Sequence, residues 1–338
     1  MTVTTHSNQY ATSVYYKAPL EASSGNTISS LVMIPGNPGL VQFYKTYLNI
    51  IQERYPQFEI FCVSHAGYQT SKPKLDGKFH FYDLSYQVDH KYEIIKQHIL
   101  EKTTKGKVLE LYFLSHSVGS YISQRLFMRL LKDEELKGKF TIKFTGLICP
   151  TIRDIRDSES GVIFTNLFKY LPVVHLFIIL ASILRFFMSE SMARSIIGKY
   201  FVDKPTIEDE KSLDSFKDSV EGCYHLYESN LLIKQTVTLA RQELEEIRSN
   251  DDVNDWFYRG PLAQSCKIWT FFATSDYWVN NVTRDYLLER YHDTESRNVV
   301  FHVDPTNAGI THSFCVHQSV EFATLTVNLL QELFPEGI

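Results

Sequence analysis

The chain contains 338 residues, of which 44% are hydrophobic and 22% are charged, a composition typical of a folded protein. This length is enough for one large domain with an insertion, or for two domains. The net charge is −5 and no basic block is present, so nucleic acid is not expected as a partner. The first ten residues are polar, which predicts no secretory signal.

The cysteine pattern and the glycine-containing turns exclude several kinds of site. The five cysteines are widely spaced and include neither a CxxC pair nor a zinc-ligand spacing, which favours reduced thiols in a cytosolic setting. The turn at 35–39 lacks the Lys-Ser/Thr pair of a phosphate-binding loop. The sequence therefore predicts no metal and no cofactor.

Strands and helices alternate along much of the sequence. Several of the predicted strands are continuous apolar runs, as in a sheet that is covered on both faces. The helix over 83–100 carries apolar residues on one face, and so does the last helix, where Val316, Val320, Ala323, Val327, Leu330 and Phe334 share a face. The alternation predicts a mostly parallel, doubly wound α/β sheet. The predicted strands are 13–17, 29–34, 59–63, 107–114, 144–148, 267–273 and 298–303.

One serine lies where a strand turns sharply into a helix. The run 109–114 is apolar, Ser115-His-Ser-Val-Gly119 follows, and an amphipathic stretch continues to Leu131. In α/β-hydrolases a Gly-x-Ser-x-Gly elbow of this kind exposes a nucleophile, here Ser117. The first glycine of that pattern is replaced by Ser115. A second Ser-x-Gly match at 23–25 has no such context.

A serine nucleophile also needs two backbone N–H groups directed at the developing oxyanion. One would come from Val118, the residue after the nucleophile. The other would come from the turn Pro35-Gly-Asn-Pro-Gly39, which follows a predicted strand; Pro38 has no N–H, so Asn37 is the expected donor. The same residues also fit an ordinary tight turn, and the two interpretations are compatible.

The alternation stops between residues 151 and 260, where no convincing strand is found. We expect a helical cap, so that 1–150 and 261–338 form the core. The cap's apolar segment, 162–188, contains the run 171–184, which would rise about 21 Å as a helix, short of the roughly 30 Å needed to span a bilayer. Pro172 favours two helical pieces with a bend. The segment is either a buried helix lining an acyl pocket or a monotopic anchor, with Lys169, Arg185 and Arg194 near lipid headgroups.

The acid and the base of a triad are expected in loops after late strands, in the chain order Ser, Asp, His. Asp276 follows the strand at 267–273, where a turn-capping role is the alternative. His312 lies between the last strand and the last helix. The other candidate acids are Asp304 and Asp154. The nearby histidines were assigned no catalytic role: His302 inside a strand, His317 on the last helix, and His116 beside the nucleophile with its side chain directed elsewhere.

With these residues in place, the chain resembles the lipid-droplet-associated hydrolase family, a branch of the α/β-hydrolases found in fungi and animals. The resemblance implies Ser117 as nucleophile, Asp276 as acid and His312 as base, with Ser115 where the family has glycine. It also favours the anchor interpretation of 162–188 and localisation to lipid droplets, the alternatives being the cytoplasm or the surface of the endoplasmic reticulum. The segments that carry it are 34–39 with Phe43-Tyr44, 63–67, 84–91, 115–119 and 311–315.

The leading functional hypothesis is a serine ester hydrolase that acts on neutral lipid esters, such as triacylglycerol or sterol ester, through an acyl-enzyme. Its expected partners are that substrate and a lipid-droplet monolayer or membrane surface. Two alternatives remain open from the sequence. One is a lipid acyltransferase, in which an alcohol replaces water. The other is a weakly active or inactive hydrolase scaffold that acts as a droplet-surface protein.

Overall fold

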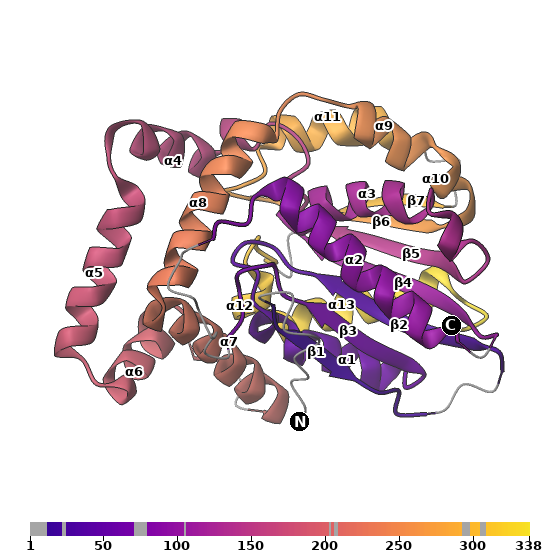
Figure 1. The fold of residues 1–338 in the computed structure, drawn as a ribbon, viewed down its shortest axis with the longest axis horizontal. Coiled ribbons are helices and arrows are strands. Elements are labelled where there is room, and N and C mark those ends of the chain that lie inside the picture. The colour runs from indigo at the N-terminus through magenta and orange to yellow at the C-terminus, as the bar shows by residue number, and fades with distance from the viewer. Residues whose placement is uncertain are drawn as a thin grey trace.

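A seven-stranded sheet forms the centre of the molecule (Figure 1). The computed structural model describes residues 12–21, 25–70, 80–104, 106–202, 204–205, 209–292, 298–304 and 309–338, so segment 1–10 lies outside the described residues. The strand order is β1-β3-β2-β4-β5-β6-β7; β1 is antiparallel to β3 and the other pairs are parallel. The strands are Val14–Lys17, Thr27–Ile34, Phe58–Val63, Val108–His116, Phe140–Ile148, Lys267–Phe272 and Val299–Val303.

The predicted α/β architecture is confirmed, and each predicted strand corresponds to an observed one. The largest difference is in β5, which begins at Phe140, four residues before the predicted start at Phe144. Of residues 140–143 only Ile142 is buried, whereas the rest of the strand is fully buried. An apolar run therefore marks only the buried part of this strand.

Helices cover both faces of the sheet, so its strands are buried on both sides (Figure 1). α2 packs against α3 on one face, and α1 packs against α13 on the other. The elements of this layer and its connections are η1 Val41–Tyr44, α1 Lys45–Arg54, α2 Leu84–Lys102, α3 Val118–Leu130, η2 Glu134–Leu136, α11 Asn281–Tyr291, α12 Phe314–His317 and α13 Ser319–Leu333.

The prediction of one continuous last helix is wrong, because the helix is interrupted at Gln318 between α12 and α13. The Gln318 side chain accepts a hydrogen bond from the N–H of Thr311 at 2.9 Å and donates to the carbonyl of Gly309 at 2.7 Å. These bonds fix the loop that carries His312. The apolar spacing could not reveal the break, since it continues across Gln318.

Between β5 and β6, the residues that the structure describes form helices and the loops that join them, and no strand. α4 and α5 meet at Leu171 and Pro172 with a bend of 91°, as Pro172 predicted. α5 packs against α8 and α7, while α4, α5 and α6 together form the outer layer at the left of Figure 1. The elements are η3 Ile155–Asp157, α4 Glu159–Tyr170, α5 Val173–Phe187, α6 Glu190–Tyr200, α7 Glu210–Glu228, α8 Asn230–Glu246, α9 Asp252–Arg259 and α10 Pro261–Ser265.

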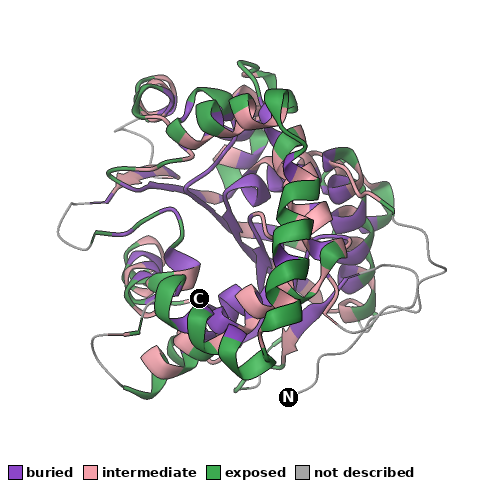
Figure 2. Cartoon of the chain, turned by 90° about the vertical axis from the view of Figure 1, so that its left-hand side faces the viewer, coloured by how far each residue is buried: buried purple, intermediate pink, exposed green. Residues whose placement is uncertain are grey.

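The outer layer of residues 159–201, which we call the apolar arm, consists largely of exposed residues (Figure 2), and many of them are large and hydrophobic. Of the twenty exposed large hydrophobic residues in the described chain, sixteen lie between Val162 and Phe201. In α5 only Val173 and Ala181 are buried, so the expectation of a buried helix is wrong for α5, although Phe177 of this helix does line the cavity described below. No single helix in the described chain is long and apolar enough to span a membrane; only the bent pair α4 and α5 reaches that length and composition together.

Candidate active site

The turn between β4 and α3 holds Ser117 in a strained conformation, with φ 52° and ψ −125°. The surrounding structure holds Ser117 in this conformation, because β4 and α3 are both packed in the core. Gly119 lets α3 pass close to the end of β2: a Cβ at this position would lie 2.4 Å from the carbonyl oxygens of Ile34 and Pro35. The glycine is therefore required where the helix backbone meets the turn after β2.

Ser115 fits the elbow without displacing it. Its side chain is buried and its Oγ lies 2.6 Å from the Oγ of Ser123, on the first turns of α3. The Ser120 hydroxyl also donates to the carbonyl of Ser115 at 3.1 Å. These bonds satisfy the polar group that replaces the usual glycine and tie the strand to the helix.

The structure brings Ser117, His312 and Asp276 into one hydrogen-bonded chain. His312 Nε2 lies 3.0 Å from Ser117 Oγ, and His312 Nδ1 lies 2.8 Å from Asp276 Oδ2. Burial alone would raise the pKa of Asp276, but the charge and hydrogen bond of His312 and two backbone N–H groups hold it below its ordinary value. An ionised carboxylate can orient the ring so that Nε2 accepts the serine proton.

The two oxygens of Asp276 have different partners. Oδ2 faces His312, while Oδ1 accepts hydrogen bonds from the N–H groups of Trp278 at 2.7 Å and Val279 at 3.0 Å. One side chain therefore makes the contacts that the turn-capping and the triad interpretations each require. The alternative acids have other partners: Asp304 accepts from the N–H of Ile310, and Asp154 accepts from Ser249.

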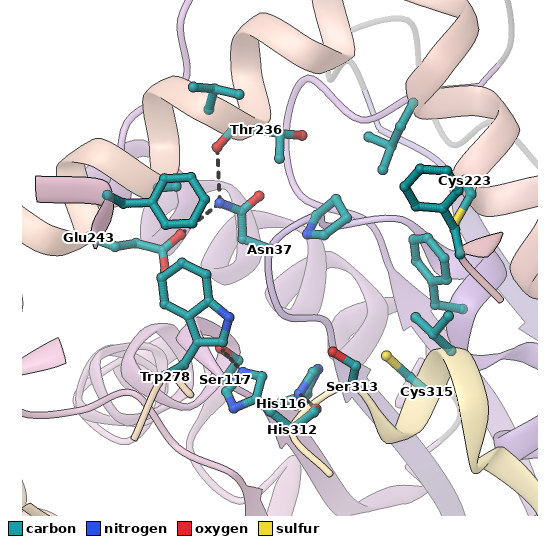
Figure 3. A pocket seen from close by; sticks show the side chains of 18 of the residues that line it. Asn37, His116, Ser117, Cys223, Thr236, Glu243, Trp278, His312, Ser313 and Cys315 are labelled. Atoms are coloured by element: carbon teal, nitrogen blue, oxygen red, sulfur yellow. Dashed lines mark hydrogen bonds between the residues drawn. The ribbon is translucent and has the colours of Figure 1, made fainter. Parts of the chain in front are cut away.

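The turn with the second expected oxyanion donor is held from the core and from the cap (Figure 3). The Asn37 side chain accepts from the hydroxyl of Tyr68 at 2.8 Å and donates to the carbonyl of Thr236 at 3.1 Å and to Glu243 Oε1 at 2.9 Å. Thr236 and Glu243 belong to α8. The backbone N–H of Val118 is among the first helical amides, which have no acceptor inside α3.

Glu243 is a buried carboxyl in the wall of the site. Burial raises its pKa to about 8, although the hydrogen bond from Asn37 acts in the opposite direction. Near neutral pH the side chain is therefore largely uncharged. The sequence analysis did not identify this residue, because Glu243 lies in a charged helix where a carboxylate usually faces solvent.

Residues of α2 support the turn at 35–39 indirectly. They belong to the motif Gln-x-x-His-Lys, which runs from Gln87 to Lys91. Gln87 bonds to both the N–H and the carbonyl of Ala66, and Lys91 Nζ donates to the carbonyl of Ser64 at 2.7 Å. Burial lowers the pKa of Lys91 to about 7. The segment that they hold contacts the turn directly, because the N–H of His65 donates to the carbonyl of Gly39 at 3.0 Å.

His116 has a role that the sequence analysis did not assign. Its Nε2 lies 2.9 Å from the carbonyl oxygen of His312, and its Nδ1 lies 2.8 Å from the hydroxyl of Tyr44. Because the carbonyl can only accept, Nε2 carries the proton and Nδ1 accepts from Tyr44. The same hydroxyl accepts from the N–H of Gly36 at 2.9 Å. His116 and Tyr44 thus link the nucleophile elbow, the oxyanion turn and the histidine loop.

The nearby histidines His302 and His317 bond to residues outside the triad, although His317 also lines the cavity described below. His302 in β7 accepts a hydrogen bond from the Trp269 ring N–H at 3.2 Å, and His317 in α12 donates to the carbonyl of Val202 at 2.9 Å. Both have structural partners. These contacts agree with the non-catalytic roles expected for them from the sequence.

A cavity of about 520 Å³ lies beside Ser117 and His312 (Figure 3). Its wall near the triad carries the polar side chains of Asn37 and Glu243. Most of the remaining wall is apolar, with side chains from the core, from α7 and α8, and from the apolar arm. They include Phe43, Phe164, Phe168, Phe177, Phe201, Leu226, Ile233, Val237 and Trp278. Such a site suits an apolar ligand with one polar group near the serine.

One group of residues has atoms close enough to hold a metal ion. Donor atoms of Cys149, Asp276 and His312 lie within 4.8 Å of one another. In the structure Asp276 and His312 bond to each other, and burial raises the pKa of the Cys149 thiol well above its usual range. A neutral thiol is a poor metal ligand. The group therefore fits a triad with a buried cysteine beside it.

Comparison with known proteins places the chain in a family. The family model described as lipid-droplet associated hydrolase matches residues 28–315. The chain belongs to this family of hydrolases. The protein named lipid droplet-associated hydrolase from Rattus norvegicus is 23% identical over 330 residues, covering 90% of this chain and 86% of that protein. The one from Drosophila melanogaster is 20% identical over 310 residues, covering 89% of each.

Solved structures show the same fold. A serine hydrolase from Cycloclasticus zankles aligns with a TM-score of 0.54 at 14% identity, covering 96% of this chain and 95% of that one. An esterase from Exiguobacterium antarcticum aligns with a TM-score of 0.51 at 15% identity, covering 95% and 96%. A haloalkane dehalogenase variant from Bradyrhizobium elkanii aligns with a TM-score of 0.52 at 11% identity, covering 96% and 99%. At these identities the likeness shows the α/β-hydrolase fold alone.

Proposed function

We propose that the protein is a serine ester hydrolase that cleaves neutral lipid esters, such as triacylglycerol or sterol ester, at the surface of lipid droplets. The observation that carries this proposal is the hydrogen-bonded chain of Ser117, His312 and Asp276 beside an apolar cavity. A serine at the elbow fits acyl transfer to and from the enzyme.

In the proposed reaction the Ser117 Oγ attacks the ester carbonyl while His312 Nε2 takes its proton. The backbone N–H groups of Val118 and Asn37 stabilise the negative charge on the carbonyl oxygen. His312 then gives the proton to the leaving alcohol, which leaves an ester between Ser117 and the acyl group. Water, deprotonated by His312, attacks this ester and releases the fatty acid and free Ser117. Asp276 stabilises the imidazolium in both steps.

The lipid substrate and the location rest on the family and on the apolar arm. Relatives are named for lipid droplets, and the exposed hydrophobic side chains of residues 162–201 suit insertion into a phospholipid monolayer. Arg185 bonds to Tyr227 and Arg194 pairs with Glu190, so of the three cations named from the sequence Lys169 is the best placed for a headgroup. We treat 151–260 as the cap of this hydrolase and 1–150 with 261–338 as its core.

The proposal is tested by labelling purified protein with a water-soluble fluorophosphonate. Wild type is expected to be labelled and Ser117→Ala is not, because the probe phosphorus reacts only with an activated serine. A neutral-lipid emulsion is expected to increase the rate of labelling of wild type. Folded wild type that is not labelled would contradict the hydrolase function and favour the droplet-surface scaffold. Release of fatty acid with and without an added sterol or diacylglycerol then separates hydrolysis from acyl transfer.

A further inference from the structure

The catalytic cavity and the apolar arm share side chains. Phe168 of α4, Phe177 of α5 and Phe201 after α6 all line the cavity. Phe177 is 45% exposed and Phe201 is 64% exposed, whereas the other apolar side chains of the described lining are buried or half-buried. The cavity therefore reaches the outside at the arm; Ser313 and His317, beside the triad, are the other exposed residues of its lining.

The surroundings of this opening are apolar as well. Leu176 and Leu180 lie on either side of Phe177 along α5, and Tyr200 precedes Phe201; all three are exposed. At the inner end the cavity reaches Ser117 and His312. The wall thus leads from an apolar outer surface to the nucleophile.

The size of the cavity limits what it can enclose. At about 520 Å³ it has the volume of a pocket for a single small ligand, for which roughly 300–1,000 Å³ is usual. A lipid with two or three long acyl chains needs space for each of them. One chain would be enclosed, and the remainder of the lipid would stay outside.

We propose that the cavity binds one long acyl chain of a lipid that remains in the lipid layer, and that the chain enters between Phe177 and Phe201. This inference rests on the proposed function. Because the arm would lie in the lipid layer, the chain passes from one apolar environment into another without being exposed to water. The ester carbonyl then reaches Ser117 while the rest of the lipid stays in the layer.

Two fluorophosphonates separate the entry route from the chemistry. One has a short alkyl group and is dissolved in water; the other has a hexadecyl chain and is carried in phosphatidylcholine vesicles. Both react by the same step, in which the Ser117 Oγ bonds to phosphorus, fluoride leaves and His312 takes the proton. Ser117→Ala gives the background for both probes. The short probe reports the activated serine, and the long probe reports passage of a chain from the lipid.

The key variant is Phe177→Asp, and its matched control is Phe186→Asp. Phe186 lies on the same helix and is 83% exposed, but it does not line the cavity. Both variants place one carboxylate on the arm, so the bound fraction of each is measured by vesicle flotation. Total labelling by the long probe is expected to fall in both variants as binding to the vesicles weakens. Per bound protein, Phe177→Asp is expected to slow this labelling at least about tenfold further, because the chain must pass a charge, whereas Phe186→Asp has no such additional loss.

A second variant, Phe201→Trp, narrows the opening without adding charge and is expected to slow the long probe as well. It carries the test if Phe177→Asp does not fold, as judged by thermal unfolding. Equal rates with the long probe in wild type and in the folded opening variants, while the short probe labels Ser117, would overturn the entry route alone. Failure of the short probe in wild type would instead contradict the proposed function, and the entry route with it.

Discussion

The hydroxyl of Tyr44 connects two parts of the site that lie far apart in the sequence. It accepts from Gly36 in the oxyanion turn and donates to His116, which donates to the carbonyl of His312. Burial lowers the pKa of His116 to about 3, so the ring is neutral at physiological pH and its Nδ1 is free to accept. One phenol group therefore influences the positions of both the turn at 35–39 and the loop that carries His312.

We expect Tyr44→Phe to lower kcat about tenfold or more with little change in KM, because it leaves the Gly36 N–H and His116 Nδ1 without their partner. The matched control is Tyr47→Phe. Tyr47 is equally buried and loses a hydrogen bond to Thr326 at 2.9 Å, but that bond is made to α13 and not to a residue of the site. Steady-state kinetics on a soluble ester measure kcat and KM for both variants. An equal loss of kcat in both variants would indicate general destabilisation.

Glu243→Gln is expected to stabilise the protein at alkaline pH. The pKa of Glu243 rises from 4.5 to about 8 on folding, so its favourable contribution is complete below pH 4.5 and is lost as pH rises through 8. Glutamine can still accept from Asn37 and has no charge to bury. At pH 9 the free energy of unfolding should increase by the order of 1–4 kcal/mol, with a gain of less than about 1 kcal/mol at pH 5.

Urea unfolding at the two pH values measures this difference. Glu245→Gln is the control, since Glu245 lies on the same helix and is exposed. A gain for Glu243→Gln that is the same at pH 5 and pH 9 would show that ionisation of Glu243 is not its source.

Position in the chain was enough to single out Ser117, Asp276 and His312, because each follows a strand that could be recognised from its apolar run. Tyr44, His116 and Glu243 could not be found in this way. Their contacts join residues 44, 116 and 312, or the cap and the core, and such pairs leave no local spacing in a sequence. The segment 84–91 was recognisable in the sequence, but its role in supporting the turn through Lys91 and Gln87 was not.

At the level of elements, the meeting of α3 with the end of β2 limits what position 119 can hold. Alanine in place of glycine would usually favour a helix by about 1 kcal/mol. Here the added Cβ would lie 2.4 Å from two backbone oxygens, which cannot move without shifting the elbow. We therefore expect Gly119→Ala to lower the free energy of unfolding by about 1–3 kcal/mol and to slow labelling of Ser117.

Gly25→Ala provides the comparison for this substitution, because a Cβ at Gly25 would meet no atom within 4 Å. Chemical denaturation and the short fluorophosphonate probe are applied to both variants. A Gly119→Ala protein with wild-type stability and labelling would mean that the backbone at the elbow can move apart.

The elements themselves were largely readable from the sequence, with two instructive exceptions. The break at Gln318 arises from side-chain bonds to Thr311 and Gly309, which periodicity does not register. The apolar run of α5 has almost no polar face, a pattern usual for buried helices. Its exposure depends on where α7 and α8 lie, and no local signal gives that.

At the scale of the whole molecule, the hydrophobic residues are distributed unevenly over the surface. Sixteen of the twenty exposed large ones in the described chain belong to the apolar arm. Soluble proteins rarely leave such a patch open to water. The exposed hydrophobic residues of the molecule are thus concentrated on the side that carries the arm.

We expect the double variant Phe186→Asp with Phe187→Asp to bind phospholipid-coated emulsion roughly 100-fold more weakly, since each ring contributes about 1.5 kcal/mol or more on leaving water. Both rings are more than 70% exposed, at 83% and 74%, so the fold should tolerate the change. Leu131→Asp, 49% exposed at the end of α3, is the control. Flotation that is unchanged in the double variant would place the lipid contact elsewhere.

The opening of the cavity onto the arm also affects how the enzyme behaves in the laboratory. A surfactant that keeps the exposed phenylalanines dispersed has a single alkyl tail, which is chemically similar to the chain that the cavity would take. Such a surfactant is expected to compete with substrate and to raise the apparent KM in proportion to its concentration. A bulky, rigid amphiphile without a linear tail would solubilise the same surface and leave the kinetics unchanged.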